Sequence, residues 1–581
     1  MTYDKPRYGS DVMVDAMKAQ GLKYVSLNPG SSFRGLHDSI VNYGGNSPQI
    51  IECPHEKVAV ALAHGYAKAS GEAMGVILHN VVGLLQGTMG IYYAYIDRTP
   101  VVVFGGTGPM ALERRRPNID WIHTANVQGN VVRDFTKWDD QPATIASVPE
   151  TVARGYRVAC SEPAGPVYIC LDAGLQEDEL TEEVEPIDPE RYKLPSRIGP
   201  DPAALDQLAN MLVAAERPII IPGYAGRDPK AFDQLVQLAE LLGAGVIDTH
   251  IRLNFPNRHP LNVTGSDAVS DADLVLFVDV KDFGKPTQDL DRLNRKITSR
   301  IPDSAKIVDL GFNDIEISSW SHDFTQLHPT DLQVTADSSV ALPLLLERCM
   351  ELEGAQPERR DAREQRRQEL AGVHDSTWAG WRETAQAEKE LSPVATSRLA
   401  AEVWEVVKDY DWVLTAGTAS GWAHKTWDFD TAYRHPGDSL GTATQISMSL
   451  GVALAHKGSG RLVVDLQPDG DLMFDPGALW VAAYYKIPML AVMFNNRAYY
   501  NDWEHQDRMA RARGTDVDKA YLGMEINNPA PDFATIARSF GWYGDGPIDD
   551  PAKVQEAVRR AAEVVMTTGQ PALVDVVCQY E

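Results

Sequence analysis

The stretch that decides the fold is Pro468-Asp469-Gly470-Asp471, followed downstream by Asn495-Asn496. The apolar residues 463–464 precede the first of these segments, and the apolar run 487–494 leads into the second. We interpret the pattern as a strand, a turn that presents a carboxylate, a crossover helix and a second buried strand that delivers two amides. A carboxylate, a side-chain amide and a nearby backbone carbonyl form a hard oxygen site. Such a site suits Mg²⁺, which keeps few protein ligands and takes the rest from phosphate and water.

A segment near the N-terminus predicts a helix with a carboxylate in its first turn. Pro54 is a favoured residue at a helix start, and Glu56 follows it. Ala59, Ala63 and Ala67 recur four residues apart, so they share one closely packed face. The helix dipole alone would favour a first-turn carboxylate. This pattern alone leaves two interpretations of Glu56 open: a carboxylate that stabilises the helix dipole, or a functional residue.

Composition limits the classes of protein that this chain can belong to. Its 581 residues exceed one core and divide naturally into three domains. A net charge of −27 argues against a nucleic-acid partner and mildly against a coenzyme A substrate. No apolar run is long enough for a membrane span, and the N-terminus has no apolar signal region, so we expect a cytoplasmic protein. The five cysteines have no Cys-x-x-Cys spacing, and we expect them to be reduced.

The order of apolar and helical segments predicts an α/β fold. Continuous apolar strands alternate with helices, which indicates parallel sheets covered on both faces. An acidic, proline-bearing stretch, 176–200, is typical of a linker, and a stretch rich in Arg, Glu and Gln is typical of a solvated linker helix. We therefore predict an N-terminal domain at 1–190, a middle domain at 200–350, a linker at 351–392 and a C-terminal domain at 393–581.

Taken together, the two motifs resemble the thiamine-diphosphate superfamily of acetolactate synthase, pyruvate decarboxylase and benzoylformate decarboxylase. That superfamily has Gly-Asp-Gly followed by Asn-Asn; here Pro468 replaces the first glycine. The runs 165–167 and 569–576 resemble the closing strands of its first and third domains, so the resemblance covers nearly the whole chain. It implies three doubly wound parallel-sheet domains, in which two thiamine-diphosphate-binding folds flank a Rossmann-like middle domain.

The resemblance implies thiamine diphosphate and Mg²⁺ as cofactors. Glu56 matches the catalytic glutamate that binds the aminopyrimidine ring. The metal ligands would be Asp469, Asn496 and the Ala498 carbonyl. The implied cofactor-binding residues are Glu56, Gly441, Thr442, Asp469, Gly470, Asp471, Asn496 and Ala498, with the residue that wedges the cofactor left unassigned. We do not expect FAD, because residues 223–226 are only a short glycine pair typical of a turn. The cofactor lies between subunits in this superfamily, which implies a homodimer or homotetramer.

Four further residues are predicted to face the substrate. Ser31 follows the first strand in Asn28-Pro29-Gly30-Ser31 and matches the serine that contacts the substrate carboxylate in benzoylformate decarboxylase. His79 matches its proton-transfer histidine, although a lone histidine can also be structural. The stretch 279–284, which roughly corresponds to the segment with that enzyme's second histidine, has no histidine. His123 could substitute for it or be a surface residue. Asp502 matches an acidic residue of pyruvate decarboxylase-like enzymes or is a solvent-facing helix residue.

We therefore expect an enzyme that breaks and makes the C–C bond beside a carbonyl of a small-molecule 2-oxo acid. Decarboxylation with carboligation to an aldehyde or ketone acceptor, as in acetolactate synthase, is the favoured reaction. A simple 2-oxo acid decarboxylase, or a lyase acting on 2-hydroxyacyl or diketone substrates, is the alternative. A non-catalytic, cofactor-binding regulatory subunit is the alternative from another class.

Overall fold

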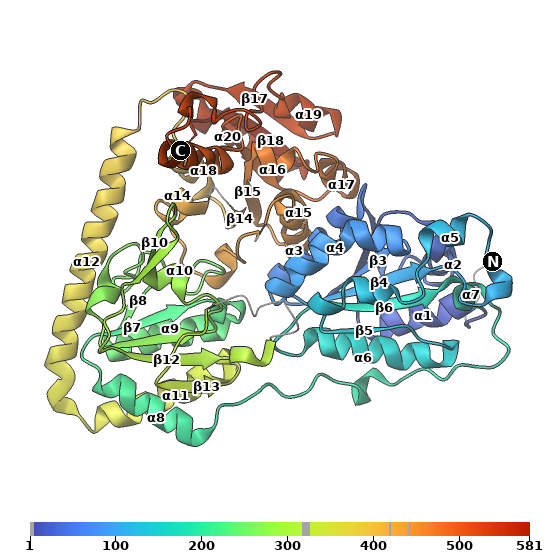
Figure 1. The fold of residues 1–581 in the computed structure, drawn as a ribbon, viewed down its shortest axis with the longest axis horizontal. Coiled ribbons are helices and arrows are strands. Elements are labelled where there is room, and N and C mark those ends of the chain that lie inside the picture. The colour runs from blue at the N-terminus through green and yellow to red at the C-terminus, as the bar shows by residue number, and fades with distance from the viewer. Residues whose placement is uncertain (1–4, 317–325, 418–419, 440, 581) are drawn as a thin grey trace.

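The computed structural model describes residues 5–316, 326–417, 420–439 and 441–580. Three α/β domains follow one another along the chain (Figure 1). The N-terminal domain lies at the right of the view, the middle domain at the lower left and the C-terminal domain at the top. Within the described ranges, no helix combines the length and the apolar character needed to cross a membrane.

The N-terminal domain is built on a six-stranded parallel sheet in the order β2-β1-β3-β4-β6-β5. Its central strands are mainly apolar and fully buried, as expected for a parallel sheet covered on both faces. The strands are β1 (Tyr24–Leu27), β2 (Gln49–Glu52), β3 (Met74–Leu78), β4 (Val101–Thr107), β5 (Trp138–Asp140) and β6 (Val167–Asp172). The helices are α1 (Gly9–Ala19), α2 (Arg34–Asp38), α3 (Glu56–Ser70), α4 (Val81–Ile96), α5 (Ile119–His123), α6 (Val148–Cys160) and α7 (Ala173–Glu177).

The middle domain has a five-stranded parallel sheet in the order β13-β12-β9-β7-β8. A two-stranded antiparallel hairpin, β10–β11, was not expected from the sequence. The strands are β7 (Pro218–Pro222), β8 (Gly245–Val246), β9 (Leu274–Val278), β10 (Gln288–Asp291), β11 (Lys296–Ser299), β12 (Lys306–Gly311) and β13 (Leu332–Thr335). The helices are α8 (Pro202–Ala214), α9 (Pro229–Leu242), α10 (Gly284–Thr287) and α11 (Ser338–Gly354), the last of which extends slightly past the expected boundary at residue 350.

A single long helix, α12 (Arg360–Ala387), connects the middle and C-terminal domains along one edge of the molecule (Figure 1). It is less solvated than its composition suggests, because Arg363, His374 and Trp378 are buried. Arg366 donates from Nε to the carbonyl of Gly243 at 2.8 Å. Arg366 and Arg367 therefore attach the helix to the carbonyls at the end of α9.

The C-terminal domain repeats the parallel architecture with the order β14-β15-β16-β18-β17. Its strands are β14 (Trp412–Ala416), β15 (Leu462–Pro468), β16 (Leu490–Asn495), β17 (Tyr543–Ile548) and β18 (Ala572–Val577). Its helices are α13 (Thr396–Val407), α14 (Ser420–His424), α15 (Gln445–Ala455), α16 (Asp469–Leu472), α17 (Ala478–Tyr485), α18 (Tyr500–Arg513), α19 (Phe533–Ser539) and α20 (Val554–Thr568). The expected architecture of three doubly wound parallel-sheet domains is confirmed.

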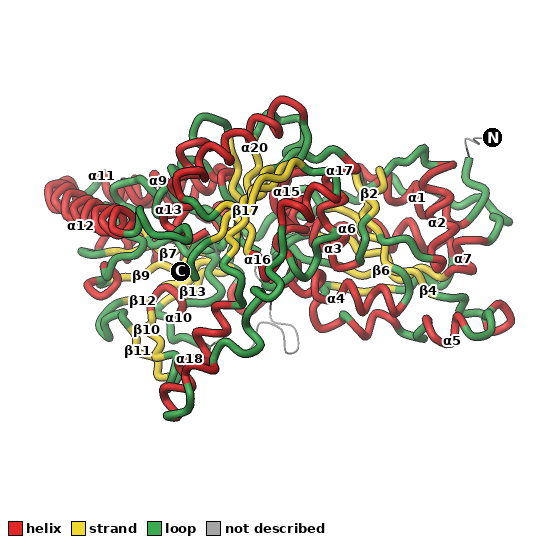
Figure 2. The backbone as a smooth tube through the Cα atoms, turned by 90° about the horizontal axis from the view of Figure 1, so that it is seen from above, coloured by secondary structure: helices red, strands yellow, loops and turns green. Residues whose placement is uncertain are grey.

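Helices α3 and α15 join the N- and C-terminal domains (Figure 2). Glycines allow the two backbones to touch. A Cβ atom on Gly65 would lie 1.9 Å from the carbonyl oxygen of Met448, and one on Gly451 would lie 2.0 Å from that of Leu62. Both distances are far below van der Waals contact. This crossing sets the position of α3, and hence of Glu56 at its first residue.

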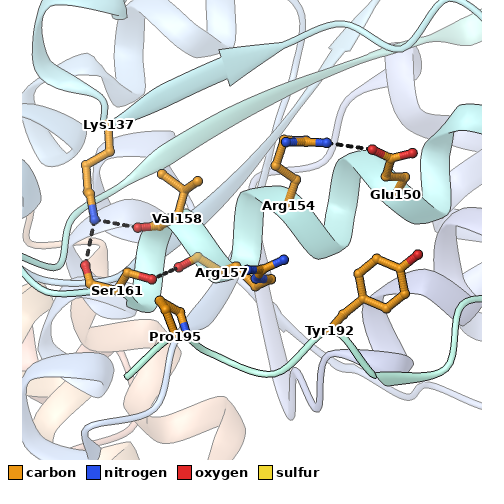
Figure 3. A pocket seen from close by; sticks show the side chains of 8 residues that line it. All are labelled: Lys137, Glu150, Arg154, Arg157, Val158, Ser161, Tyr192 and Pro195. Atoms are coloured by element: carbon orange, nitrogen blue, oxygen red, sulfur yellow. Dashed lines mark hydrogen bonds and ion pairs between the residues drawn. The ribbon is translucent and has the colours of Figure 1, made fainter. Parts of the chain in front are cut away.

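The extended linker after α7 passes over α6 and leaves a cavity of about 310 Å³ (Figure 3). Arg154 and Arg157 of α6 line it on one side, and Tyr192 and Pro195 of the linker line it on the other. Lys137 points at the end of α6 and donates to the carbonyl of Ser161 at 2.6 Å. None of the predicted site residues lines this cavity, so the candidate site lies elsewhere.

Candidate active site

The expected strand–turn–helix–strand unit forms around Asp469. Strand β15 ends at Pro468, whose φ of −67° suits the residue that precedes a helix. Asp469 then begins the short helix α16, beside the end of β16. One oxygen of its carboxylate accepts the Gly470 amide at 2.8 Å, and the other accepts the Arg497 amide at 2.6 Å. Backbone amides from two parallel strand ends therefore hold this carboxylate.

A tight turn places the asparagine amide and a backbone segment next to Asp469. Asn496 accepts the Ala498 amide on its side-chain oxygen at 3.0 Å. Arg497 lies between them with φ of 58°, a left-handed conformation that closes this turn. The Arg497 carbonyl in turn accepts the amide of Ile526 at 2.8 Å. The three expected metal ligands, Asp469, Asn496 and the Ala498 carbonyl, thus belong to one connected unit.

The chemistry around Asp469 fits a bound cation. Its side chain is 2% exposed, and no Lys, Arg or His side chain pairs with it in the described ranges. Burial raises the pKa of Asp469 to about 6, against the opposing effect of the backbone amides. A buried carboxylate needs a compensating charge. Among the residues that the structure describes, no group of three His, Cys, Asp or Glu side chains is suited to a metal. This unit of one carboxylate, one amide and one carbonyl suits a metal that shares its coordination with phosphate.

Two of the other predicted cofactor-binding residues, Gly470 and Asp471, shape the backbone around this unit. Gly470 keeps the backbone close to Tyr499, because a Cβ atom would lie 2.7 Å from its ring. The carboxylate of Asp471 accepts the amides of Ala443 and Gln445, so it ties the loop before α15 to α16. These two hydrogen bonds let Asp471 position the loop that also contains Gly441 and Thr442.

That loop contains Gly441 and Thr442. A Cβ atom on Gly441 would lie 1.8 Å from the ring of Tyr93 in α4, so any other residue there would displace the Tyr93 side chain. Thr442 is exposed. Leu440, the bulky apolar neighbour of these residues, lies outside the described residues. The residue that wedges the cofactor therefore stays unassigned.

A second buried carboxylate lies beneath the loop. Asp465 in β15 is fully buried and accepts from the side-chain nitrogen of Gln445 at 2.7 Å. Burial raises its pKa to about 7. Nothing in the local sequence marks Asp465, because an aspartate inside an apolar strand has no pattern that shows whether it is buried.

Glu56 is the first residue of α3 and is half-buried. It approaches the start of α4 at Gly83, where a Cβ atom would lie 3.2 Å from its Oε1 and 2.8 Å from the Cβ of His79. The glycine therefore allows Glu56 and His79 to converge. Lys57 pairs instead with Asp475 of the C-terminal domain at 2.9 Å. In the described part of the chain no hydrogen bond or ion pair engages the Glu56 carboxylate, which is free to bind a ligand.

His79 lies immediately after β3, at the carboxyl edge of the sheet. Its Nδ1 lies 2.8 Å from the hydroxyl of Ser32. The ring of His123 lies 5.5 Å from it, centre to centre. The Nδ1 of His123 is buried and has no hydrogen-bond partner among the described residues. Burial lowers the pKa of His79 most, followed by the charges of His123 and Arg116. The imidazole is therefore neutral near pH 7.

The two remaining predicted residues make no contacts that define a role within one chain. Ser31 is exposed, and the adjacent Ser32, which is 1% exposed, holds His79 instead. Asp502 lies in the first turn of α18 and is exposed. Sequence reasoning missed Ser32, because which of two adjacent serines turns inward depends on the helical turn that begins at Ser31.

Three family models match consecutive parts of this chain. The thiamine pyrophosphate enzyme N-terminal TPP binding domain matches residues 7–131, the central domain matches 205–345, and the C-terminal TPP binding domain matches 415–576. The chain belongs to the thiamine pyrophosphate enzymes. The first and last models contain Glu56 and Asp469, respectively, so the two halves of the candidate site fall in the two domains that these models describe as binding the cofactor.

Similar proteins cover the whole chain. A probable acetolactate synthase large subunit of Methanocaldococcus jannaschii is 24% identical over 98% of this chain and 91% of its own length. A probable chloroplastic acetolactate synthase 2 of Oryza sativa is 25% identical over 99% of this chain and 83% of its own. The crystal structure of benzoylformate decarboxylase from Polynucleobacter necessarius is 18% identical, with a TM-score of 0.76 and 99% of each chain covered. At this identity the structural likeness shows the fold alone.

Proposed function

We propose that this thiamine pyrophosphate enzyme cleaves and forms C–C bonds on 2-oxo acids, with decarboxylation followed by carboligation as the main reaction. The observation that carries the proposal is the half-buried Glu56 carboxylate, which meets His79 at Gly83 and has no protein partner in the described ranges. The acetolactate synthases among the relatives, which align over nearly the whole chain, support the carboligation reaction.

Asp469, Asn496 and the Ala498 carbonyl would hold Mg²⁺, and through it the diphosphate. When bound, thiamine diphosphate supplies the electron sink for breaking and making the C–C bond. The Glu56 carboxylate would accept a hydrogen bond at the other end of the cofactor, and its half-buried position would strengthen that bond. Gly83 keeps this position open, because any side chain there would meet His79.

His79 and His123 would face the substrate. They lie close enough to act on one small molecule, and both stand at the edge of the sheet where parallel α/β domains bind ligands. Ser31 would contact the substrate carboxylate, and Asp502 would add a polar group to the pocket. FAD is not part of the proposal.

A simple 2-oxo acid decarboxylase is the second candidate. The paired histidines favour it, because an imidazole can transfer a proton to the product. A non-catalytic subunit is disfavoured, because such a protein would have no need for a partner-free carboxylate at Glu56.

We further propose a homodimer or homotetramer in the cytoplasm. Helix α4 is apolar on both faces: Leu84 and Ile91 lie in the core, while Leu85 and Met89 are 58% and 47% exposed. Trp121 in α5 is 82% exposed. A helix that is apolar all round is normally covered, and a second copy of this chain would cover these residues. Light scattering of the purified protein would measure the number of subunits.

The test is CO₂ release from a panel of 2-oxo acids, with and without added thiamine diphosphate and Mg²⁺, with products identified by mass spectrometry. Carboligation predicts cofactor-dependent CO₂ release with an acyloin or acetolactate-type product, whereas an aldehyde alone would identify a decarboxylase. Glu56→Gln should abolish turnover and leave Mg²⁺ and cofactor binding largely intact. Full activity in that variant would disprove the proposed mechanism.

A further inference from the structure

We propose that Ser32 is a positioning residue that holds His79 as the Nε2–H tautomer, so that His79 offers a hydrogen-bond donor to the bound substrate. This inference rests on the proposed function for the identity of the substrate. It concerns a serine that is adjacent to, and distinct from, the predicted Ser31.

The hydrogen bonds around Ser32 determine the tautomer. The backbone N–H of Ser32 points at Nδ1 of His79 at 3.4 Å. An amide nitrogen can only donate, so Nδ1 must accept and the ring proton must lie on Nε2. The Asn80 amide donates to the Ser32 hydroxyl oxygen at 3.1 Å. That hydroxyl is therefore free to donate its own proton to Nδ1, 2.8 Å away.

The surroundings fix Ser32 in this orientation. The side-chain nitrogen of Gln176 donates to its carbonyl at 3.0 Å. A Cβ atom on Gly106 in β4 would lie 2.3 Å from the hydroxyl oxygen of Ser32. The glycine therefore leaves room for this hydroxyl. The imidazole itself packs against Gly30, where a Cβ atom would lie 2.7 Å from the ring. Serine and histidine are thus both confined.

The charges around the ring keep it uncharged. Arg116 and His123 face it from the segment after β4, and Asp120 pairs with Arg116 at 3.2 Å. Glu56 faces it from α3 across Gly83. Burial lowers the pKa of His79 most, and His123 and Arg116 lower it further. A neutral ring with Nδ1 occupied has one polar group left for a ligand, the Nε2–H.

This arrangement assigns a chemical role. A neutral imidazole that keeps its proton stabilises developing negative charge on a substrate oxygen by a hydrogen bond, in the manner of an oxyanion donor. No bond to hydrogen is broken in that role. It differs from the proton-transfer role that the resemblance implies for His79.

The direct test is ¹⁵N NMR of the full chain carrying ring-¹⁵N-histidine, with and without thiamine diphosphate and Mg²⁺. The His79 signals are assigned by their loss in His79→Gln. Near pH 7.5 we expect an unprotonated Nδ1 and a protonated Nε2 in the parent protein. Ser32→Ala loses the shorter hydroxyl bond to Nδ1 but keeps the backbone N–H that faces it at 3.4 Å, so the share of the Nε2–H tautomer should fall without being lost. A protonated Nδ1 in the parent protein would overturn the proposal. This measurement needs no turnover, so it remains decisive even if no 2-oxo acid is a substrate.

Kinetics supply the second readout. Losing one hydrogen bond of about 1 kcal/mol predicts a five- to tenfold lower kcat for Ser32→Ala, with a smaller change in KM. Removing a donor to Nδ1 favours the protonated ring, so the acid limb of the kcat profile should move to higher pH. Ser26→Ala is the matched control: it also removes a buried hydroxyl, one that donates to Ala59 at 2.8 Å, and it should leave that limb in place. An unmoved limb in Ser32→Ala would refute the positioning role.

Discussion

Gly65→Ala should separate the two helices that join the cofactor-binding domains. The added Cβ would lie 1.9 Å from the carbonyl oxygen of Met448 and 2.7 Å from its carbonyl carbon. Carbon contacts are optimal near 3.5–4.0 Å, so α3 and α15 would have to move apart by about 1 Å or more. The opposing atoms belong to backbone, which cannot rotate away.

The net effect follows from two opposing contributions. Overpacking costs about 1–3 kcal/mol, and backbone overlap places this site at the upper end of that range. Alanine in a helix interior recovers about 0.5–1 kcal/mol relative to glycine. We therefore expect Gly65→Ala to lose about 2 kcal/mol of stability. Turnover should fall as well, because α3 carries Glu56.

The control is Gly372→Ala in α12, where the new Cβ would have no atom within 4 Å. It should be neutral or stabilising by up to about 1 kcal/mol. Because a three-domain chain need not unfold in two states, the comparison is of apparent melting midpoints of matched samples. An apparent melting midpoint of Gly65→Ala that equals or exceeds that of Gly372→Ala would refute the reasoning about the α3–α15 crossing.

Three further changes test the buried charges. Asp465→Asn should stabilise the protein above pH 7 by up to about 4 kcal/mol, because burial raises the pKa of the Asp465 carboxyl to about 7 and the parent loses stability as pH rises from about 4 to about 7; denaturation should show the full difference at pH 8.5 and only about a third of it at pH 5. Lys68→Met should cost about 3–5 kcal/mol, because the fully buried Asp97 carboxylate loses its ammonium partner; adding Asp97→Asn should restore part of the melting temperature, and no restoration would contradict the pairing. Asp469→Asn should weaken Mg²⁺-dependent binding of thiamine diphosphate at least about tenfold by calorimetry, and unchanged affinity would remove Asp469 from the metal site.

Local patterns carried much of the fold. Strands β15 and β16 form at the apolar residues 463–464 and 487–494 that predicted them, and α3 begins just after Pro54, as expected. The hairpin β10–β11 escaped prediction, because its strands are exposed and polar and so lack a buried pattern. The helix α12 was expected, but its attachment to α9 was not, because arginine contacts with distant carbonyls leave no periodic signal.

The sequence by itself predicted the residues proposed to bind the metal in the candidate site. Spacing along the chain specifies Asp469 and Asn496, because strand ends in a parallel sheet meet at one edge whatever lies further away. Only the tertiary structure decided which neighbours support them. The choice of Ser32 over Ser31 beside His79 and the contact of Gly65 with Met448 join segments far apart in the chain. Such contacts depend on how closely two packed elements approach each other. The order of residues along the chain does not contain that distance between elements.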